Sequence, residues 1–97
     1  MSIRFHPESE KELKESVYWY EYQRKGLGFE FLFCVDEAIE QIKNRPQMYP
    51  LVTEKTRRIV VKRFPFAIFY ETNKSSIYIL AIFHLRRNPK EWKNRKS

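Results

Sequence analysis

The chain has little of several features that mark particular classes of protein. Its 97 residues include one cysteine, Cys34, which cannot form an internal disulfide bond. No stretch approaches the roughly 18 uncharged apolar residues of a membrane-spanning helix, and the opening MSIRFHPESE lacks the apolar core of a secretory signal peptide. No internal repeat or low-complexity tract is present. Together these absences predict a cytoplasmic protein whose thiol stays reduced.

Acidic residues are scarce in the second half of the sequence. Residues 55–97 hold twelve Lys/Arg and two Asp/Glu, a net charge of +10, whereas residues 1–54 hold seven and ten, a net charge of −3. The whole chain therefore carries +7. A basic half on a small domain indicates an acidic or polyanionic partner, and the alternative is a solvated basic surface with no partner.

The composition predicts one small globular domain over residues 1–97. Hydrophobic residues make up 42% of the chain and aromatic residues 16%, which excludes a disordered protein. A domain of this size has a single core and little stability to spare.

The N-terminal half predicts one strand and two helices. Ile3 and Phe5 alternate with polar residues, which is typical of a strand over residues 2–6. Pro7 and the glutamates that follow it predict a helix that runs to Arg24. Both glycines of the chain fall in the break Lys25–Gly28, after which a second apolar stripe predicts a helix to Asn44. So short a break makes the two helices an antiparallel hairpin.

The C-terminal half predicts three strands, over residues 57–62, 65–72 and 77–84. The resulting fold class is α+β, with element order β-α-α-β-β-β and the helix hairpin packed on a twisted antiparallel sheet. The last strand is apolar on both predicted faces, with Ile77, Ile79, Ala81 and Phe83 on one and Tyr78, Leu80 and Ile82 on the other. The hairpin can cover only one face. The other is covered either by a partner or by the chain's own C-terminal segment.

The stretch after the last predicted strand carries the clearest functional signal. The apolar run IYILAIF ends at His84, and a short basic segment follows it. A buried strand that ends in so much charge indicates that its end opens onto a working surface. Residues 90–96 predict a short basic helix or tail, in which Trp92 either packs onto the domain or contacts a target.

Three local patterns give this order of elements a resemblance to a known family. They are Trp19-Tyr20-Glu21 with Gly26-Leu27-Gly28 and Phe31; Ile42, Pro46 and Tyr49-Pro50; and Arg57-Arg58, Arg63-Phe64-Pro65, Phe69-Tyr70, His84, Arg86-Arg87, Pro89 and Trp92. In their order and spacing they make nearly the whole chain resemble the RelE/ParE superfamily of toxins, from type II toxin–antitoxin modules.

The resemblance implies a protein that arrests growth when free and takes part in plasmid stabilization. A cognate acidic antitoxin, encoded beside it, holds such a toxin inactive in an oligomer; no membrane, metal or cofactor is implied. ParE-like members poison DNA gyrase and have no known hydrolytic site. RelE-like members enter the ribosomal decoding site and cut messenger RNA.

The nuclease alternative predicts a specific set of residues. Metal-free RNA cleavage uses the 2′-hydroxyl as nucleophile and needs a proton donor or acceptor, together with cations on the phosphate. His84 is the candidate acid or base, and Arg86 and Arg87 are the candidate phosphate ligands. The alternative is structural: His84 caps the strand end, and the arginines lie in a solvated loop or pair with antitoxin carboxylates. Residues expected to bind RNA or another target are Arg57, Arg58, Lys62, Arg63, Lys90, Trp92, Lys93 and Arg95.

Two departures from the nuclease pattern favour the ParE-like reading. Several nuclease members carry an arginine three residues before a strand-three tyrosine; if that tyrosine is Tyr70, the position holds Ala67. Many also place a tyrosine or basic residue where this chain has Leu85. We therefore expect a ParE-like gyrase poison. A ribosome-dependent endonuclease is the first alternative, and a degenerate toxin that only binds antitoxin is the second.

Overall fold

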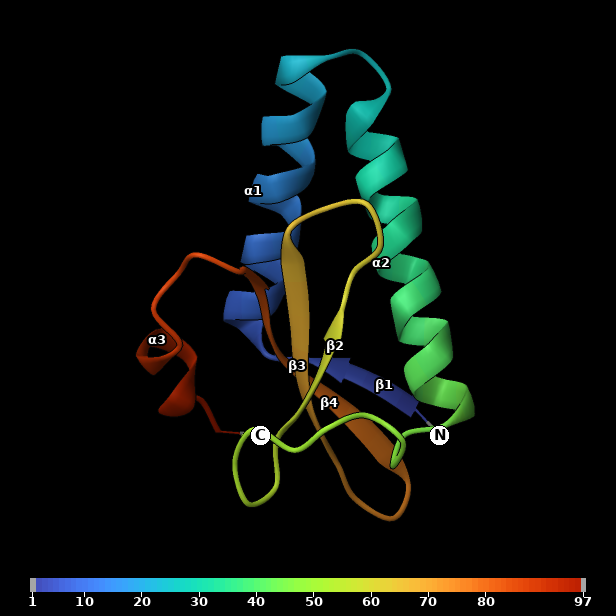
Figure 1. The fold of residues 1–97 in the computed structure, drawn as a ribbon, viewed down its shortest axis with the longest axis vertical. Helices are drawn as coiled ribbons and strands as arrows, with labels where there is room; N and C mark the ends of the chain where they lie inside the picture. Colours follow the sequence, from blue (N-terminus) through green and yellow to red (C-terminus); the bar gives the residue numbers. More distant parts are fainter. Residues whose placement is uncertain (1, 97) are drawn as a thin grey trace.

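The computed structural model describes residues 2–96, and its elements follow the predicted order, with a short helix in the predicted C-terminal helix or tail (Figure 1). The elements are β1 (Ser2–Phe5), α1 (Pro7–Gln23), α2 (Leu27–Asn44), β2 (Arg57–Val60), β3 (Phe66–Thr72), β4 (Ser76–His84) and α3 (Lys90–Lys93). The predicted α+β class is confirmed, with two helices packed on a four-stranded sheet. No helix among residues 2–96 is both long and apolar enough to cross a membrane.

The sheet is mixed, which corrects the expectation that it is antiparallel throughout. Its strand order is β1-β4-β3-β2. β2, β3 and β4 pair antiparallel, but β1 runs parallel to β4. The connection from β1 to β4 passes through the helix hairpin and the other two strands, so no tight turn forces the two to run in opposite directions. β4 lies inside the sheet, as its apolar composition predicts.

The break between the two helices is built around Glu21. Its carboxylate accepts hydrogen bonds from the backbone N–H groups of Gly26, at 2.9 Å, and Gly28, at 3.0 Å, which lie at the start of α2. Gly26 has φ +89°, in the left-handed region where glycine carries no steric penalty. A Cβ atom on Gly28 would lie 2.6 Å from the carbonyl oxygen of Val17, so this glycine lets α1 and α2 approach closely.

The main core lies between the helix hairpin and one face of the sheet. Phe31, Val35 and Ile42 of α2 are fully buried against it, and Cys34 is 4% exposed. Tyr70 of β3 is fully buried, and its hydroxyl donates to the carbonyl oxygen of Pro46 at 2.8 Å. That bond ties the loop after α2 to the sheet.

A β-bulge in β4 changes which side chains face the hairpin. Tyr70 pairs with Ile79 and Phe69 pairs with Ala81, so Leu80 is an extra residue with no partner on β3. Ile79 and Ile82 therefore both face the main core, and strict alternation along β4 is wrong. Sequence alternation cannot show a bulge in a strand that is apolar on both faces.

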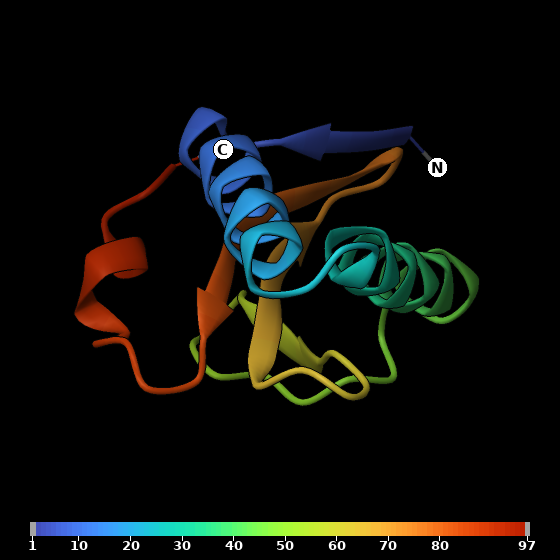
Figure 2. The same ribbon diagram turned by 90° about the horizontal axis from the view of Figure 1, so that it is seen from above.

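The chain's own C-terminal segment covers the second face of the sheet, which was one of the two alternatives for that face. Trp92 is 2% exposed and stacks on Phe69, with ring centroids 4.4 Å apart. Around this pair lie Leu80, Ala81 and Phe83, which form a second, smaller core. α3 thus lies on the side of the sheet away from α2 (Figure 2). The prediction that Trp92 packs the tail onto the domain is confirmed.

Candidate target-binding surface

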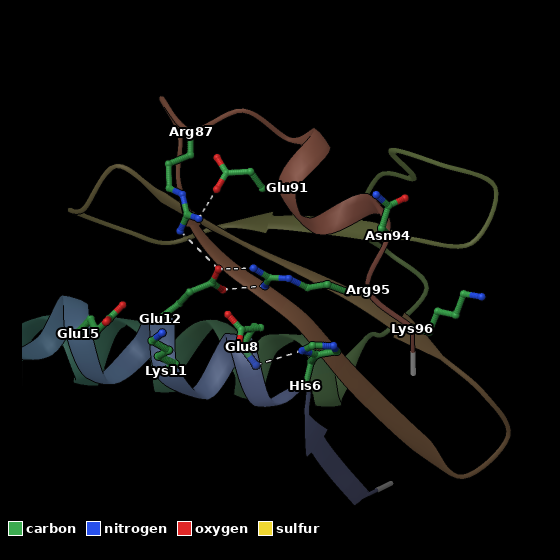
Figure 3. Close-up of a pocket in the computed structure, with 10 residues that line it drawn as sticks. All are labelled: His6, Glu8, Lys11, Glu12, Glu15, Arg87, Glu91, Asn94, Arg95 and Lys96. Atoms are coloured by element: carbon green, nitrogen blue, oxygen red, sulfur yellow. Dashed lines mark hydrogen bonds and ion pairs between the residues drawn. The ribbon is translucent and has the colours of Figure 1, made fainter.

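The C-terminal segment lies between two open clefts. A cleft of about 840 Å³ separates it from α1, and its lining mixes acidic residues with basic ones (Figure 3). A second cleft, of about 710 Å³, lies on its other side, against residues 53–56 and Glu71. This segment, residues 90–96, is called the strap: it contacts the sheet beneath it and leaves both flanks open to solvent.

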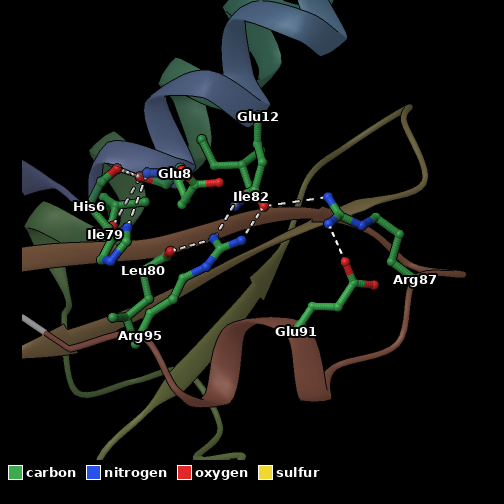
Figure 4. Close-up of polar contacts among 10 residues, drawn as sticks. His6, Glu8, Glu12, Ile79, Leu80, Ile82, Arg87, Glu91 and Arg95 are labelled. Carbon is green, nitrogen blue, oxygen red and sulfur yellow. Dashed lines mark hydrogen bonds and ion pairs between the residues drawn. The ribbon is translucent and has the colours of Figure 1, made fainter.

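One buried carboxylate holds this strap in place. Glu12 of α1 is 8% exposed and accepts hydrogen bonds from Arg95 at 2.9 and 2.6 Å (Figure 4). The same carboxylate accepts the backbone N–H of Ile82 at 3.1 Å, and Arg95 donates to the carbonyl oxygen of Leu80 at 2.9 Å. The ion pair thus satisfies the carbonyl group of the bulged residue, Leu80, and the N–H group of Ile82 just after it. Such groups are costly when they are buried without a partner.

Arg87 joins the same network. Its guanidinium donates to Glu91 at 2.6 Å and to Glu12 at 3.4 Å, and it lies over the ring of Phe83 at 3.9 Å. Burial opposes the charge on Arg87, but the two carboxylates outweigh that effect and raise its pKa. The candidate phosphate ligand is therefore already occupied by acidic groups of its own chain.

His84 lies half-buried at the end of β4. Its Nδ1 atom accepts the backbone N–H of Arg86 at 3.1 Å, and its ring meets Phe66 edge-on at a centroid distance of 5.2 Å. The predicted capping contact is therefore present. A groove of about 240 Å³ runs beside the ring, lined in part by Glu15, Trp19 and Arg87. This groove combines an imidazole with a carboxylate and a cation.

The two arginines of β2 face opposite sides of the sheet, as alternation predicts. Arg57 donates to the carbonyl oxygen of Tyr49 at 2.6 Å and to Gln47 at 2.8 Å, so it holds the loop before β2. Arg58 lines a pocket of about 100 Å³ that it shares with His84 and Trp92. Of the two, Arg58 is the cation that the fold brings to the His84 end.

The turn between β2 and β3 holds the next pair of predicted cations. Lys62 is exposed. Arg63 has φ +70°, an uncommon conformation for a residue with a side chain, and its guanidinium donates to Glu30 at 2.6 Å. Arg63 and Arg24 together lower the pKa of Glu30. Arg63 therefore ties the β2–β3 turn to α2.

Three predicted cations remain exposed around His84 and the strap. Arg86, Lys90 and Lys93 are solvent-facing side chains that make no ion pair with another residue in the described range 2–96. We call these three residues and Arg58, which shares a pocket with His84, the basic rim. Lys93 lines the second cleft. Lys62, in the β2–β3 turn, is likewise exposed and makes no ion pair among the described residues.

Sequence reasoning missed the roles of two glutamates. Glu12 and Glu30 resemble ordinary acidic residues near helix N-termini, yet each binds two arginines. Both partners of Glu12 come from the distant C-terminal segment, and one partner of Glu30, Arg63, lies 33 positions away. The position of Glu12 carried a weak signal, because it falls beside the apolar positions of α1. Its partner Arg95 lies 83 positions away, and no local pattern links them.

Within the described part of the chain, no group of three His, Cys, Asp or Glu side chains lies close enough to hold a metal ion.

Comparison with known proteins identifies the family of this chain. The family model described as the ParE toxin of type II toxin–antitoxin system, parDE, matches residues 3–89. The chain belongs to this family. Its fold is similar to that of a solved structure titled "Chromosomal ParDE TA system from P. aeruginosa", with a TM-score of 0.64 and 21% sequence identity. That match covers 87% of this chain and 95% of the other. No curated protein matches the sequence.

Membership of the ParE family places the chain among type II toxins and implies an antitoxin partner. The family match ends at Pro89, so it stops before α3 and Arg95. The strap that covers the second sheet face thus lies beyond the region that the family model describes.

Proposed function

We propose that this ParE-family protein is a gyrase poison that acts by binding rather than by cutting RNA. The observation that carries the proposal is the state of Arg87. A phosphate ligand has to present free donors, and this guanidinium is shared between Glu12 and Glu91. A surface that only binds a protein target, in contrast, needs exposed charged side chains and a shape that fits the target, and no free guanidinium at this position.

The basic rim formed by Arg58, Arg86, Lys90 and Lys93 is the proposed contact with the target. It lies in the half of the chain that carries +10, and the same field would attract an acidic antitoxin. The antitoxin would then block the toxin by covering the surface that the target needs. Ala67, in the strand that passes under this rim, supplies no further cation.

One feature supports the RelE-like alternative. The Nδ1 atom of His84 is fixed by the backbone N–H of Arg86, which leaves Nε2 as the nitrogen able to exchange a proton with a ligand in the adjoining groove. Against this alternative, Glu15 lines the same groove, and its negative charge would repel a phosphate backbone.

Two sets of variants separate the candidates in cells. In the gyrase reading, His84→Ala keeps its toxicity, whereas Arg86→Ala with Lys90→Ala and Lys93→Ala reduces growth arrest because three rim cations are lost. Lys25→Ala with Lys55→Ala and Lys74→Ala, which removes three exposed cations outside the rim, is the matched control for charge. Growth arrest that disappears with His84→Ala, together with mapped transcript cleavage, would overturn the proposal and establish the endonuclease. Normal growth with the unaltered chain would leave a degenerate toxin that only binds antitoxin.

A further inference from the structure

The helix hairpin exposes four aromatic side chains on the side away from the sheet. They are Tyr18, 74% exposed, and Tyr22, 91% exposed, on α1, with Phe29, 76% exposed, and Phe33, 63% exposed, on α2. Each pair has i, i+4 spacing, so each forms a stripe on one side of its helix. The tip of the hairpin, which carries Tyr22 and Phe29, projects beyond the β2–β3 turn (Figure 1).

Both stripes continue down their helices as charged residues of opposite sign. On α1, Lys14 and Lys11 lie on the same side as Tyr18, four and seven residues before it. On α2, Asp36 and Glu40 continue the stripe of Phe33 at i+3 and i+7. We call these eight residues the outer hairpin face.

The acidic half of this face lacks enough cations within its own chain. Burial and the neighbouring carboxylate of Glu40 raise the pKa of Asp36, and Glu40 has only the exposed Lys43 as partner. Lys11 and Lys14 pair with no acid in the described residues 2–96. The two charged stripes therefore lie on one face without neutralising each other.

The two stripes also match in register. Tyr22 and Phe29 lie equally far along the chain from the Lys25–Gly26 junction, and so do Tyr18 and Phe33, and Lys11 and Glu40. Lys14 and Asp36 differ by one residue. In an antiparallel hairpin the members of each pair therefore lie at nearly the same position along the helix axes.

We propose that the outer hairpin face binds the same face of a second copy of this chain. The two hairpins lie side by side and point in the same direction, with their tips at the same end. A two-fold axis parallel to the hairpin places α1 of one copy against α2 of the other. Aromatic side chains then meet aromatic side chains. Each lysine of one copy lies opposite a carboxylate of the other copy at nearly the same height along the helix axis. The two-fold symmetry repeats every such pair.

The size of the face and its charge favour this occupant over the antitoxin. Taking about 200 Å² for each aromatic side chain, the four expose on the order of 600 Å², close to one side of a small stable interface. The two lysines and two carboxylates of the face sum to zero charge, so an acidic antitoxin could pair with the lysines alone, whereas a second copy can pair with all four. In this arrangement the strap and the basic rim, on the other side of each sheet, remain free.

Sedimentation velocity of the full chain, up to about 100 µM, tests for the dimer, because interfaces of this size reach micromolar affinity. Tyr22→Gln with Phe29→Gln removes two central anchors and is expected to weaken dimerisation at least tenfold. Met48→Gln with Leu51→Gln, two exposed apolar residues outside the face, is the matched control and should still dimerise. Circular dichroism checks that both variants keep the fold.

A charge exchange tests the register. Lys11→Glu with Lys14→Glu, and Asp36→Lys with Glu40→Lys, should each give a monomer, because each places like charges opposite each other across the interface. Mixing the two variants should restore a heterodimer, since every pair then has opposite charges. An effect within one chain could not produce that rescue. A monomeric unaltered chain, a dimer that survives the glutamine variant, or no rescue on mixing would each overturn the proposal.

Discussion

Replacing Glu12 by alanine removes the carboxylate that joins α1, the β4 bulge and the C-terminal strap. The Glu12 and Arg95 side chains are 8% and 10% exposed, so the change leaves a nearly buried guanidinium without its partner and an Ile82 N–H without an acceptor. Breaking a buried ion pair on one side costs about 3–5 kcal/mol. That is a large share of the roughly 5–15 kcal/mol that stabilises a domain.

Thermal unfolding provides the assay. In a domain of this size each kcal/mol shifts Tm by about 4–8 °C, so Glu12→Ala should lower Tm by at least about 12 °C. Glu15→Ala is the control. Glu15 is exposed and lies one turn along α1 from Glu12, so its loss should change stability by no more than about 0.5 kcal/mol.

Adding Arg95→Ala completes a double-mutant cycle. The double variant should be less destabilised than the sum of the single ones, because the stranded charge is gone. It should not regain full stability, because Leu80 and Ile82 still lack their partners. Trypsin should also cleave the strap faster in Glu12→Ala than in the unaltered chain. A Tm within about 3 °C of the unaltered protein would refute the assigned role of Glu12.

Two further predictions concern the rest of the fold. Gly28→Ala should cost about 1–3 kcal/mol in the free energy of unfolding, because its Cβ would lie 2.6 Å from the Val17 carbonyl oxygen; equal stability in urea would contradict the close helix approach. Burial raises the pKa of Tyr70 to about 12, so the unfolded chain loses this proton at lower pH than the folded one. Stability should then fall as pH rises from about 10 through 12, and Tyr70→Phe should flatten that part of the pH profile. An unchanged profile in Tyr70→Phe would show that the phenol is not protected.

The helices and strands could be predicted from the sequence because their signals are local. The bounds of α1 and α2 follow from Pro7, the Lys25–Gly28 break and the apolar stripes, and each agrees within one residue at the C-terminal end. The parallel direction of β1 and the bulge at Leu80 could not be predicted. β1 pairs with residues more than 70 positions away, and the bulge lies in a strand that is apolar on both faces, so the sequence pattern gives no sign of either.

The candidate site was predicted only in outline. The sequence indicated that the end of β4 opens onto a charged surface, and His84, Arg58 and Arg86 do gather there. It could not separate free cations from paired ones, because an arginine reads the same in both states. Arg87 and Arg95 are held by Glu12, and Arg63 by Glu30. Only the fold distributes these charges between structure and surface.

The central claim is that the chain poisons gyrase without acting as a nuclease, and purified components test it most directly. The full-length protein is added to gyrase with relaxed plasmid and, separately, to translating ribosomes on a defined messenger RNA. We expect inhibited supercoiling or trapped DNA breaks with both the unaltered chain and His84→Ala, and an intact messenger. Unaffected gyrase together with a messenger that the unaltered chain cuts and His84→Ala does not would contradict the account.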